Sequence, residues 1–277
     1  MFEVLSNTVI GPSLHRMVIR APRIAAARKP GQFVIVRLAE GEERIPLTIG
    51  DANMAEGTIT LFIQAVGAST RMIVATPVGG SIRDIAGPLG KPTHIERWGR
   101  VACVGGGVGT AVLYPLAKAL ADAGNEVTTI IGGRAANLII LKDELAAFSS
   151  KVLITTEDGS MGRKGFVTME LADLLADPAT CPHAVFAIGP VPMMKAVSEL
   201  TRPQAVPTYV SLNPIMIDGT GMCGGCRVTV GGESKFACVD GPEFNAHQVD
   251  FDNLFARLGT YREHEAADCR LKEQVKS

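Results

Sequence analysis

The stretch Val101-Ala102-Cys103-Val104-Gly105-Gly106-Gly107-Val108-Gly109-Thr110 places four apolar residues directly before a glycine-rich turn. An Ala- and Leu-rich segment, residues 110–123, follows the turn and ends before Gly124. A buried strand that enters a helix through glycines brings backbone amides close to a phosphate, at the positive end of the helix dipole. The spacing is not G-x-G-x-x-G, because Thr110 takes the place of the last glycine. The stretch predicts an α/β domain and, at the turn, either a nucleotide site or an ordinary tight connection.

Strand and helix patterns alternate after this turn. Apolar strands are expected at 127–131, 152–155 and 184–188, helical patterns occupy 138–148 and 167–175, and a further helix is expected to open at Lys195. This alternation predicts a mostly parallel sheet covered on both faces. Two later turns, Glu157-Asp158 and Gly189-Pro190, also follow strands, and open α/β sheets bind ligands at the carboxyl ends of their strands. Together the three turns favour a nucleotide crevice.

The choice between NAD and NADP stays open at this level. No acidic residue follows the strand at 127–131, where a Rossmann domain would bind the ribose. Arg134 lies there instead, and it is suited either to a 2′-phosphate or to solvent.

The residues before Trp98 follow a different pattern. Short β-rich runs such as 33–36 and 59–63 are separated by Pro and Gly, which predicts a barrel or a sandwich. From about Pro207 the chain loses periodicity and becomes rich in Gly and Cys, and the charged tail at 251–276 is expected to be helical. We therefore expect three domains: a β-barrel at 1–98, an α/β parallel-sheet domain at 99–206, and a small C-terminal segment with its tail at 207–277.

The C-terminal segment contains a spaced set of metal ligands. Asp218, Cys223, Cys226 and Cys238 follow the plant-type [2Fe–2S] spacing C-x4-C-x2-C with a distant fourth ligand, except that aspartate takes the first place. The pattern predicts a [2Fe–2S] cluster held by three thiolates and one carboxylate. A zinc site with His247 as the fourth ligand remains an alternative, as do a redox-active C-x-x-C pair and ligation by Cys269 in place of Asp218.

Composition excludes several classes of function. A formal net charge of −1 over 277 residues gives no electrostatic basis for binding nucleic acid. No apolar run is long enough to span a bilayer, and the N-terminus lacks the pattern of a signal peptide. Six unevenly placed cysteines do not resemble a secreted disulfide framework, so a cytoplasmic location is expected. The five histidines are scattered, and no catalytic residue is assigned.

The order of motifs resembles the ferredoxin–NADP reductase superfamily. The motifs are Arg44-Ile-Pro46-Leu47-Thr48, Val66-Gly-Ala-Ser-Thr70, Gly87-Pro-Leu-Gly90 and then the glycine-rich turn at 105–110. The phrase from Asp218 to Val230, with Phe236-Ala-Cys-Val-Asp-Gly-Pro-Glu-Phe244, narrows the resemblance to iron–sulfur flavoprotein electron-transfer subunits. It is most similar to the small (alpha) subunits of NADH-dependent reduced ferredoxin:NADP oxidoreductases, also known as sulfide dehydrogenase beta subunits. The related electron-transfer subunits of dihydroorotate dehydrogenase typically carry cysteine at the first ligand place.

The resemblance implies roles for particular residues. Arg44 would contact an FAD phosphate, and Pro46, Leu47 and Thr48 would line its isoalloxazine. Gly67, Ala68, Ser69 and Thr70 would hold the FAD pyrophosphate, with serine where the family commonly has glycine. Gly106, Gly107, Val108 and Gly109 would bind the pyrophosphate of NAD(H) or NADP(H), and Glu157, Asp158, Gly189 and Pro190 would complete that pocket. Asp218, Cys223, Cys226 and Cys238 would hold the cluster.

The function expected from the resemblance is electron transfer between NAD(P)H, FAD and the cluster, to or from a larger redox subunit with its own flavin and iron–sulfur clusters. Ferredoxin is a further candidate partner. Two alternatives remain: the electron-transfer subunit of dihydroorotate dehydrogenase in pyrimidine synthesis, and a non-enzymatic, zinc-stabilised nucleotide-binding module.

Overall fold

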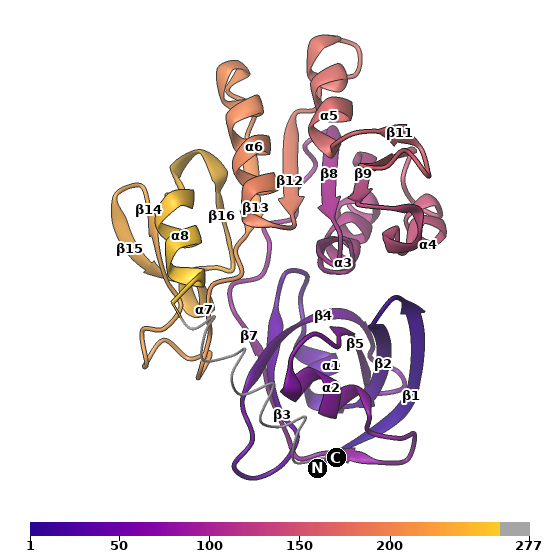
Figure 1. Cartoon of the computed structure of the whole chain (residues 1–277), viewed down its shortest axis with the longest axis vertical. Coiled ribbons are helices and arrows are strands. Elements are labelled where there is room, and N and C mark those ends of the chain that lie inside the picture. The colour runs from indigo at the N-terminus through magenta and orange to yellow at the C-terminus, as the bar shows by residue number, and fades with distance from the viewer. Residues whose placement is uncertain (261–277) are drawn as a thin grey trace.

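The computed structural model describes residues 1–260, which form a β-barrel, an α/β domain and a smaller C-terminal segment (Figure 1). The barrel lies at the bottom of that view, with the α/β domain above it. The C-terminal segment, residues 213–260, lies beside the α/β domain. The predicted fold class, a β-barrel followed by a parallel α/β domain and a small C-terminal segment, is confirmed.

The barrel is a seven-stranded antiparallel sheet in the order β6-β1-β2-β5-β4-β3-β7. Apolar residues alternate along its strands, so that one face of the sheet supplies a closed core that includes Met17, Val34 and Leu61. Its elements are β1 (Phe2–Gly11), β2 (Leu14–Arg20), α1 (Pro22–Ala27), β3 (Phe33–Arg37), β4 (Ile45–Asn53), β5 (Thr58–Gln64), α2 (Ala68–Val74), β6 (Ser81–Ile82) and β7 (Asp84–Leu89).

The second sheet has the order β11-β10-β9-β8-β12-β13-β16, and its strands are parallel except for the pairing of β13 with β16. The order of the strands reverses between β8 and β12. This reversal is the topological switch point at which open α/β sheets bind ligands. The strands are β8 (Arg100–Gly106), β9 (Glu126–Gly133), β10 (Lys151–Thr156), β11 (Arg163–Lys164), β12 (Ala184–Ile188), β13 (Thr208–Ser211) and β16 (Glu243–Asn245).

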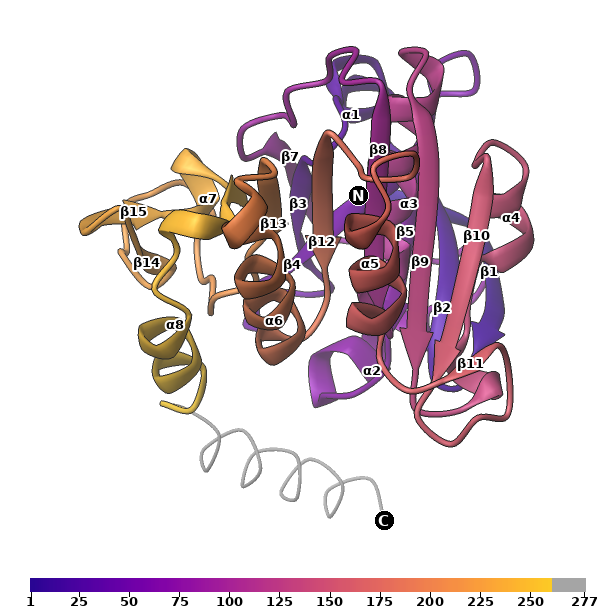
Figure 2. The same ribbon diagram turned by 90° about the horizontal axis from the view of Figure 1, so that it is seen from above.

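Helices cover both faces of this sheet (Figure 2). α5 (Val167–Ala176) and α6 (Val191–Thr201) pack on one face, and α3 (Gly109–Asp122) packs on the other. The helix expected to open at Lys195 begins four residues earlier, because Pro192 fits the first turn of a helix, where its missing N–H is not needed. The helical pattern at 138–148 forms only η1 (Ala136–Leu138) and α4 (Lys142–Ala146).

Polar and aromatic contacts join the barrel to the α/β domain. Arg16 Nη2 on β2 lies 2.5 Å from Glu144 Oε1 on α4, and the Arg16 guanidinium lies over the ring of Phe62. Phe62 also meets Tyr114 of α3 edge-on, with ring centroids 6.4 Å apart. These contacts hold the barrel against α3 and α4 of the α/β domain.

The C-terminal segment is attached to the edge of the second sheet. Its elements are β14 (Arg227–Val230), β15 (Glu233–Phe236), α7 (Ala237–Asp240), β16, η3 (Ala246–Gln248) and α8 (Phe251–Leu258), while η2 (Arg202–Gln204) precedes β13. β14 and β15 form a separate hairpin. β13 and β16 lie beyond residue 206 and nevertheless belong to the α/β sheet, because β16 pairs with β13 there.

The predicted helical tail is observed as α8 at its start, and its remainder from residue 261 lies outside the described residues, as does Cys269. Among residues 1–260, no helix is long and apolar enough to cross a membrane.

Candidate nucleotide and metal sites

A cavity of about 1210 Å³ opens between the barrel and the carboxyl ends of the parallel strands. This volume exceeds that of the usual single-ligand pocket, so the cavity has room for more than one nucleotide portion. It gathers all three turns that were singled out in the sequence. Of the predicted residues, the cavity is lined by Pro46, Thr48, Gly106, Gly107, Val108, Gly109, Glu157, Gly189 and Pro190.

The glycine-rich turn packs tightly against the turn that follows β12. A Cβ atom on Gly109 would lie 2.4 Å from the carbonyl oxygen of Ile188, and one on Gly106 would lie 2.4 Å from Met193 Sδ. Gly107 has φ +54°, in the left-handed region that favours glycine. The glycines are therefore required by the close approach of the two turns, and they leave backbone amides at the cavity wall.

The turn after β10 has one predicted residue in the cavity and one that supports the turn. Glu157 lines the cavity, and its backbone N–H donates to Gly133 O at 3.1 Å. Asp158 Oδ1 instead accepts from the backbone N–H and the hydroxyl of Ser160, at 2.9 and 2.6 Å. These bonds lower the pKa of Asp158, and its carboxylate stabilises its own turn.

On β4, alternate residues face opposite sides of the strand. Pro46 and Thr48 line the cavity, whereas Leu47 packs against the core of the barrel. This separation follows from the period of two along a strand. Of the three residues expected to line the isoalloxazine, two therefore face the cavity.

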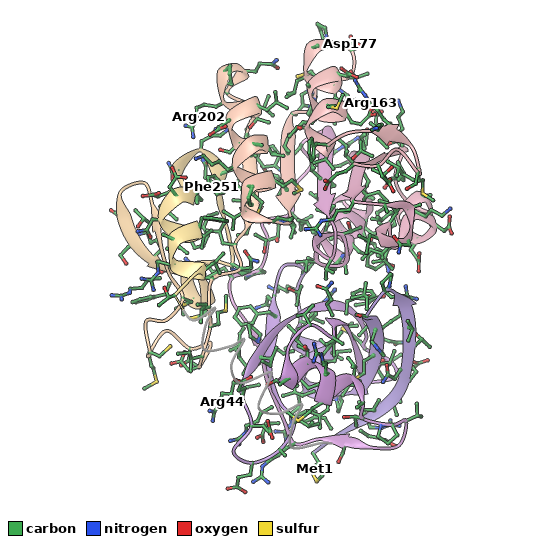
Figure 3. All side chains as sticks on the ribbon, viewed as in Figure 1. Met1, Arg44, Arg163, Asp177, Arg202 and Phe251 are labelled. Atoms are coloured by element: carbon green, nitrogen blue, oxygen red, sulfur yellow. The ribbon has the colours of Figure 1, made fainter. Side chains whose placement is uncertain are left out.

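The predicted FAD phosphate residues lie together outside the cavity wall. Arg44 is exposed and lies at the edge of the barrel, on the side of the C-terminal segment (Figure 3). The neighbouring Glu43 accepts a hydrogen bond from the Ser69 hydroxyl at the start of α2. Thr70 Oγ1 accepts from the backbone N–H of Gly67 at 3.0 Å. The loop of Arg44 and the turn at 67–70 thus meet through the bond between the Ser69 hydroxyl and the Glu43 carboxyl group.

The four predicted cluster ligands lie on one glycine-rich loop and on α7. Cys226 Sγ and Cys238 Sγ are buried and lie 3.2 Å apart, too far for a disulfide. Cys223 is exposed, and Asp218 accepts from its backbone N–H at 2.9 Å. The backbone N–H of Thr220 is the largest cause of the lowered pKa of Asp218.

The donor set of this loop fits an iron–sulfur cluster. Burial, and then the neighbouring Cys226 thiol, raise the pKa of Cys238 to about 12, so a bound metal must displace the thiol proton. Backbone N–H groups of Gly225 and Cys238 point at the sulfurs of Cys223 and Cys226, at 3.4 and 3.5 Å. Such bonds to sulfur are a feature of cluster sites.

No preformed metal site is observed in the described part of the chain. No three Asp, Glu, Cys or His side chains within residues 1–260 converge closely enough to hold one ion, and this includes the four predicted cluster ligands. His247 is engaged elsewhere, because its Nε2 lies 3.0 Å from Thr201 Oγ1 on α6.

Known proteins resemble this chain over its whole length. A family model described as the iron–sulfur cluster binding domain of dihydroorotate dehydrogenase B matches residues 213–250, which include all four predicted ligands. The electron transfer subunit homolog of dihydroorotate dehydrogenase B (NAD(+)) from Thermotoga maritima is 46% identical over 95% of this chain and 92% of its own length. This chain belongs to the family of dihydroorotate dehydrogenase B electron-transfer subunits. The subunit from Geobacillus thermodenitrificans is 32% identical over 89% of this chain and 96% of its own.

Solved structures of known proteins agree with this family assignment. A chain from the structure of NADH-dependent reduced ferredoxin–NADP oxidoreductase, described for flavin-based electron bifurcation, is 44% identical, with a TM-score of 0.92 over 100% of this chain and 98% of its own. The ferredoxin reductase of carbazole 1,9a-dioxygenase, 18% identical with a TM-score of 0.63 over 76% of this chain and 67% of its own, shares the fold alone.

Several wall residues of this electron-transfer subunit were not identified from the sequence. Phe166 lines the cavity although 61% of it is exposed, and Phe33 of β3, Gln64 of β5 and Pro242, just before β16, reach the same cavity. Arg134, by contrast, was singled out in the sequence as suited to a 2′-phosphate or to solvent, and it lines the cavity as well. No local motif surrounds Phe166, and an exposed aromatic residue can be recognised only once its position beside the cavity is known.

A carboxyl group joins the linker after the barrel to the C-terminal segment. Glu243 Oε2 on β16 accepts from Thr93 Oγ1 at 3.2 Å, and Lys91 N–H donates to Gly241 O at 2.6 Å. Burial raises the pKa of Glu243 to about 7, against smaller opposing effects of Thr93 and His94. Glu243, where the linker after the barrel meets the C-terminal segment, therefore has a pKa near neutrality.

Replacing Glu243 with glutamine is expected to remove part of the pH dependence of stability. A carboxyl whose pKa is higher in the folded chain stabilises it below pH 4.5, and this stabilisation is lost as the pH rises through about 7. Allowing for partial exposure, we expect the wild type to lose about 1–2 kcal/mol relative to Glu243→Gln between roughly pH 5 and pH 8. Chemical unfolding at both pH values measures this, with the exposed Glu56→Gln as the control. Parallel pH profiles for Glu243→Gln and the wild type would contradict the assignment.

Proposed function

We propose that this chain passes electrons between NAD(P)H, FAD and a [2Fe–2S] cluster, to or from a larger partner subunit. The observation that carries the proposal is the single cavity in which Pro46 and Thr48 of the barrel face the glycine-rich turn at the switch point of the second sheet. Bound FAD would supply the exchange between the two-electron chemistry of a nicotinamide and the one-electron chemistry of an iron–sulfur cluster.

The residues of the cavity suit the binding and orientation of two nucleotides. The amides of Gly106–Gly109 lie at the start of α3, where the helix dipole favours a pyrophosphate. The barrel wall at Pro46 and Thr48 would hold a flat ring opposite that turn. Arg44 and the turn at Gly67–Thr70 would bind the phosphates of FAD at the edge of the barrel, outside the main cavity.

The cluster would be bound by Asp218, Cys223, Cys226 and Cys238. Cys226 and Cys238 provide a paired, buried anchor, while Cys223 and Asp218 lie on the exposed side of the loop. The two exposed ligands would close around a cluster through movement of the loop, whose four glycines, at positions 219, 221, 224 and 225, favour such movement.

The exposed surface of the ligand loop suits a partner protein. Met222 is 87% exposed, Ile217 51% and Val239 44%, and all three adjoin the proposed ligands in sequence. Apolar side chains gathered on one surface are typical of protein contacts. We propose that the larger redox subunit, with its own flavin and iron–sulfur clusters, binds here and exchanges electrons with the cluster.

The reaction of the complex is proposed to be that of an NADH-dependent reduced ferredoxin:NADP oxidoreductase. The similarity to that structure supports this choice, as does aspartate at the first ligand place. A partner that oxidises dihydroorotate is the second candidate, supported by the names of several relatives. Identification of the subunit that co-purifies with the native chain separates the two.

Anaerobic addition of NADH or NADPH to the purified chain tests the proposal. We expect one nucleotide to bleach the flavin absorbance and to produce the signal of a reduced cluster in the same sample. A comparison of KM for the two nucleotides then determines the preference. A chain that contains flavin but is reduced by neither nucleotide would contradict the proposed function.

A further inference from the structure

The last turn of α8 is bonded to the ligand loop. Arg257 Nη2 donates to the backbone oxygen of Gly225 at 3.2 Å. Gly225 lies between Cys223 and Cys226, so this contact reaches the middle of the proposed C-x-x-C pair. Phe251 and Leu254 of α8 are buried against the rest of the C-terminal segment and hold the helix in place. The position of Arg257 is therefore set by packing and not by the loop itself.

No carboxylate neutralises this guanidinium in the described part of the chain. Arg257 takes part in none of the ion pairs formed within residues 1–260. It lines a small cavity of about 290 Å³ whose other walls are Arg227, Val228, Thr229, Ser234 and Asn253, none of them acidic. Arg227, which follows Cys226 in the sequence, brings a second cation to the wall of this cavity.

We propose that Arg257 is a positioning residue that raises the reduction potential of the cluster. One-electron reduction adds one negative charge to the cluster, and a nearby fixed positive charge stabilises that form more than the oxidised one. The same guanidinium holds the Gly225 carbonyl, and so fixes the direction of the loop between two ligands. The inference rests on the proposed cluster, and it concerns how readily that cluster accepts an electron.

Redox titration of the anaerobic holoprotein, followed by the EPR signal of the reduced cluster, tests this proposal. Arg257→Gln removes the charge, and Arg257→Lys keeps it without the planar donor group. Arg202→Gln is the matched control, because Arg202 Nη2 makes the same kind of bond to a carbonyl oxygen, that of His247, at 3.0 Å. Arg202 lies at the end of α6, away from the ligand loop (Figure 3).

At a fixed ambient potential, we expect the ratio of reduced to oxidised cluster in Arg257→Gln to fall about threefold to tenfold, and a tenfold fall corresponds to about 59 mV. Arg257→Lys is expected to lie closer to the wild type, and Arg202→Gln to match it, with iron and sulfide contents unchanged in all. An unaltered potential in Arg257→Gln would overturn the proposal. Loss of iron from Arg257→Gln would also overturn the proposal, because Arg257 would then be needed for the structure of the ligand loop and not for the reduction potential of the cluster. A wild type without any cluster signal would instead refute the proposed function.

Discussion

Replacing Cys226 with serine is expected to abolish cluster binding. Cys226 is 2% exposed and its Sγ lies 3.2 Å from that of Cys238, so the variant loses half of the buried anchor. A serine hydroxyl is a harder and far less acidic ligand than a thiol, and it is a much poorer partner for cluster iron than the thiolate it replaces. Iron and acid-labile sulfide per chain should fall at least about tenfold, while bound flavin stays at the wild-type level.

Cys103→Ser is the matched control for this experiment. Cys103 is also completely buried, but it lies in β8 and packs in the core on the α3 side of the parallel sheet. Its burial raises the pKa of the thiol, as expected of an inert core cysteine. The control should lose stability and keep its cluster. Retention of iron and sulfide by Cys226→Ser would show that the buried thiol pair is not the anchor.

Replacing Gly109 with alanine is expected to weaken nucleotide binding strongly. The new Cβ would lie 2.4 Å from Ile188 O and 2.7 Å from Gly189 Cα, which are backbone atoms that cannot turn away. The turns after β8 and β12 must therefore separate. Loss of a hydrogen bond to a charged phosphate costs about 1.5–3 kcal/mol, so KM for the preferred nucleotide should rise at least about tenfold. The free energy of unfolding should fall by about 1–3 kcal/mol.

Gly79→Ala separates this steric effect from a general effect of an added methyl group. A Cβ at Gly79 meets nothing within 4 Å, and its φ of +81° costs a non-glycine residue about 1 kcal/mol. Steady-state reduction by NADH and NADPH, with chemical unfolding, measures both variants. Gly79→Ala should keep the wild-type KM. An unchanged KM in Gly109→Ala would mean that the nucleotide does not bind across these two turns.

Local sequence patterns predicted those parts of the fold and of the candidate site that depend on neighbouring residues. The strand, glycine turn and helix at Val101–Asp122 form one continuous segment, so their chemistry is visible in the sequence. The ligand spacing at Asp218–Cys226 is equally local. The pattern of short β-rich runs separated by Pro and Gly also predicted a barrel or a sandwich for the residues before Trp98, and a barrel is observed there.

Contacts between distant elements could not be predicted in this way. Phe166 and Pro242 line the cavity only because α5 and β16 begin beside it. Pairing of β16 with β13 joins the C-terminal segment to the α/β sheet, although the sequence suggests a separate unit after residue 206. The bond from Arg257 to Gly225 spans 32 residues and depends on how α8 packs. Such features follow from tertiary packing, which a single sequence does not display.

We propose that one carboxylate and three thiolates of this chain hold a [2Fe–2S] cluster that exchanges electrons with a bound flavin. Iron and sulfide analysis of anaerobically purified wild-type protein, with EPR spectra before and after reduction by dithionite, tests it most directly. We expect about two iron and two sulfide per chain, and a rhombic signal that appears only on reduction. A colourless protein that contains zinc, with neither sulfide nor a signal, would contradict the account.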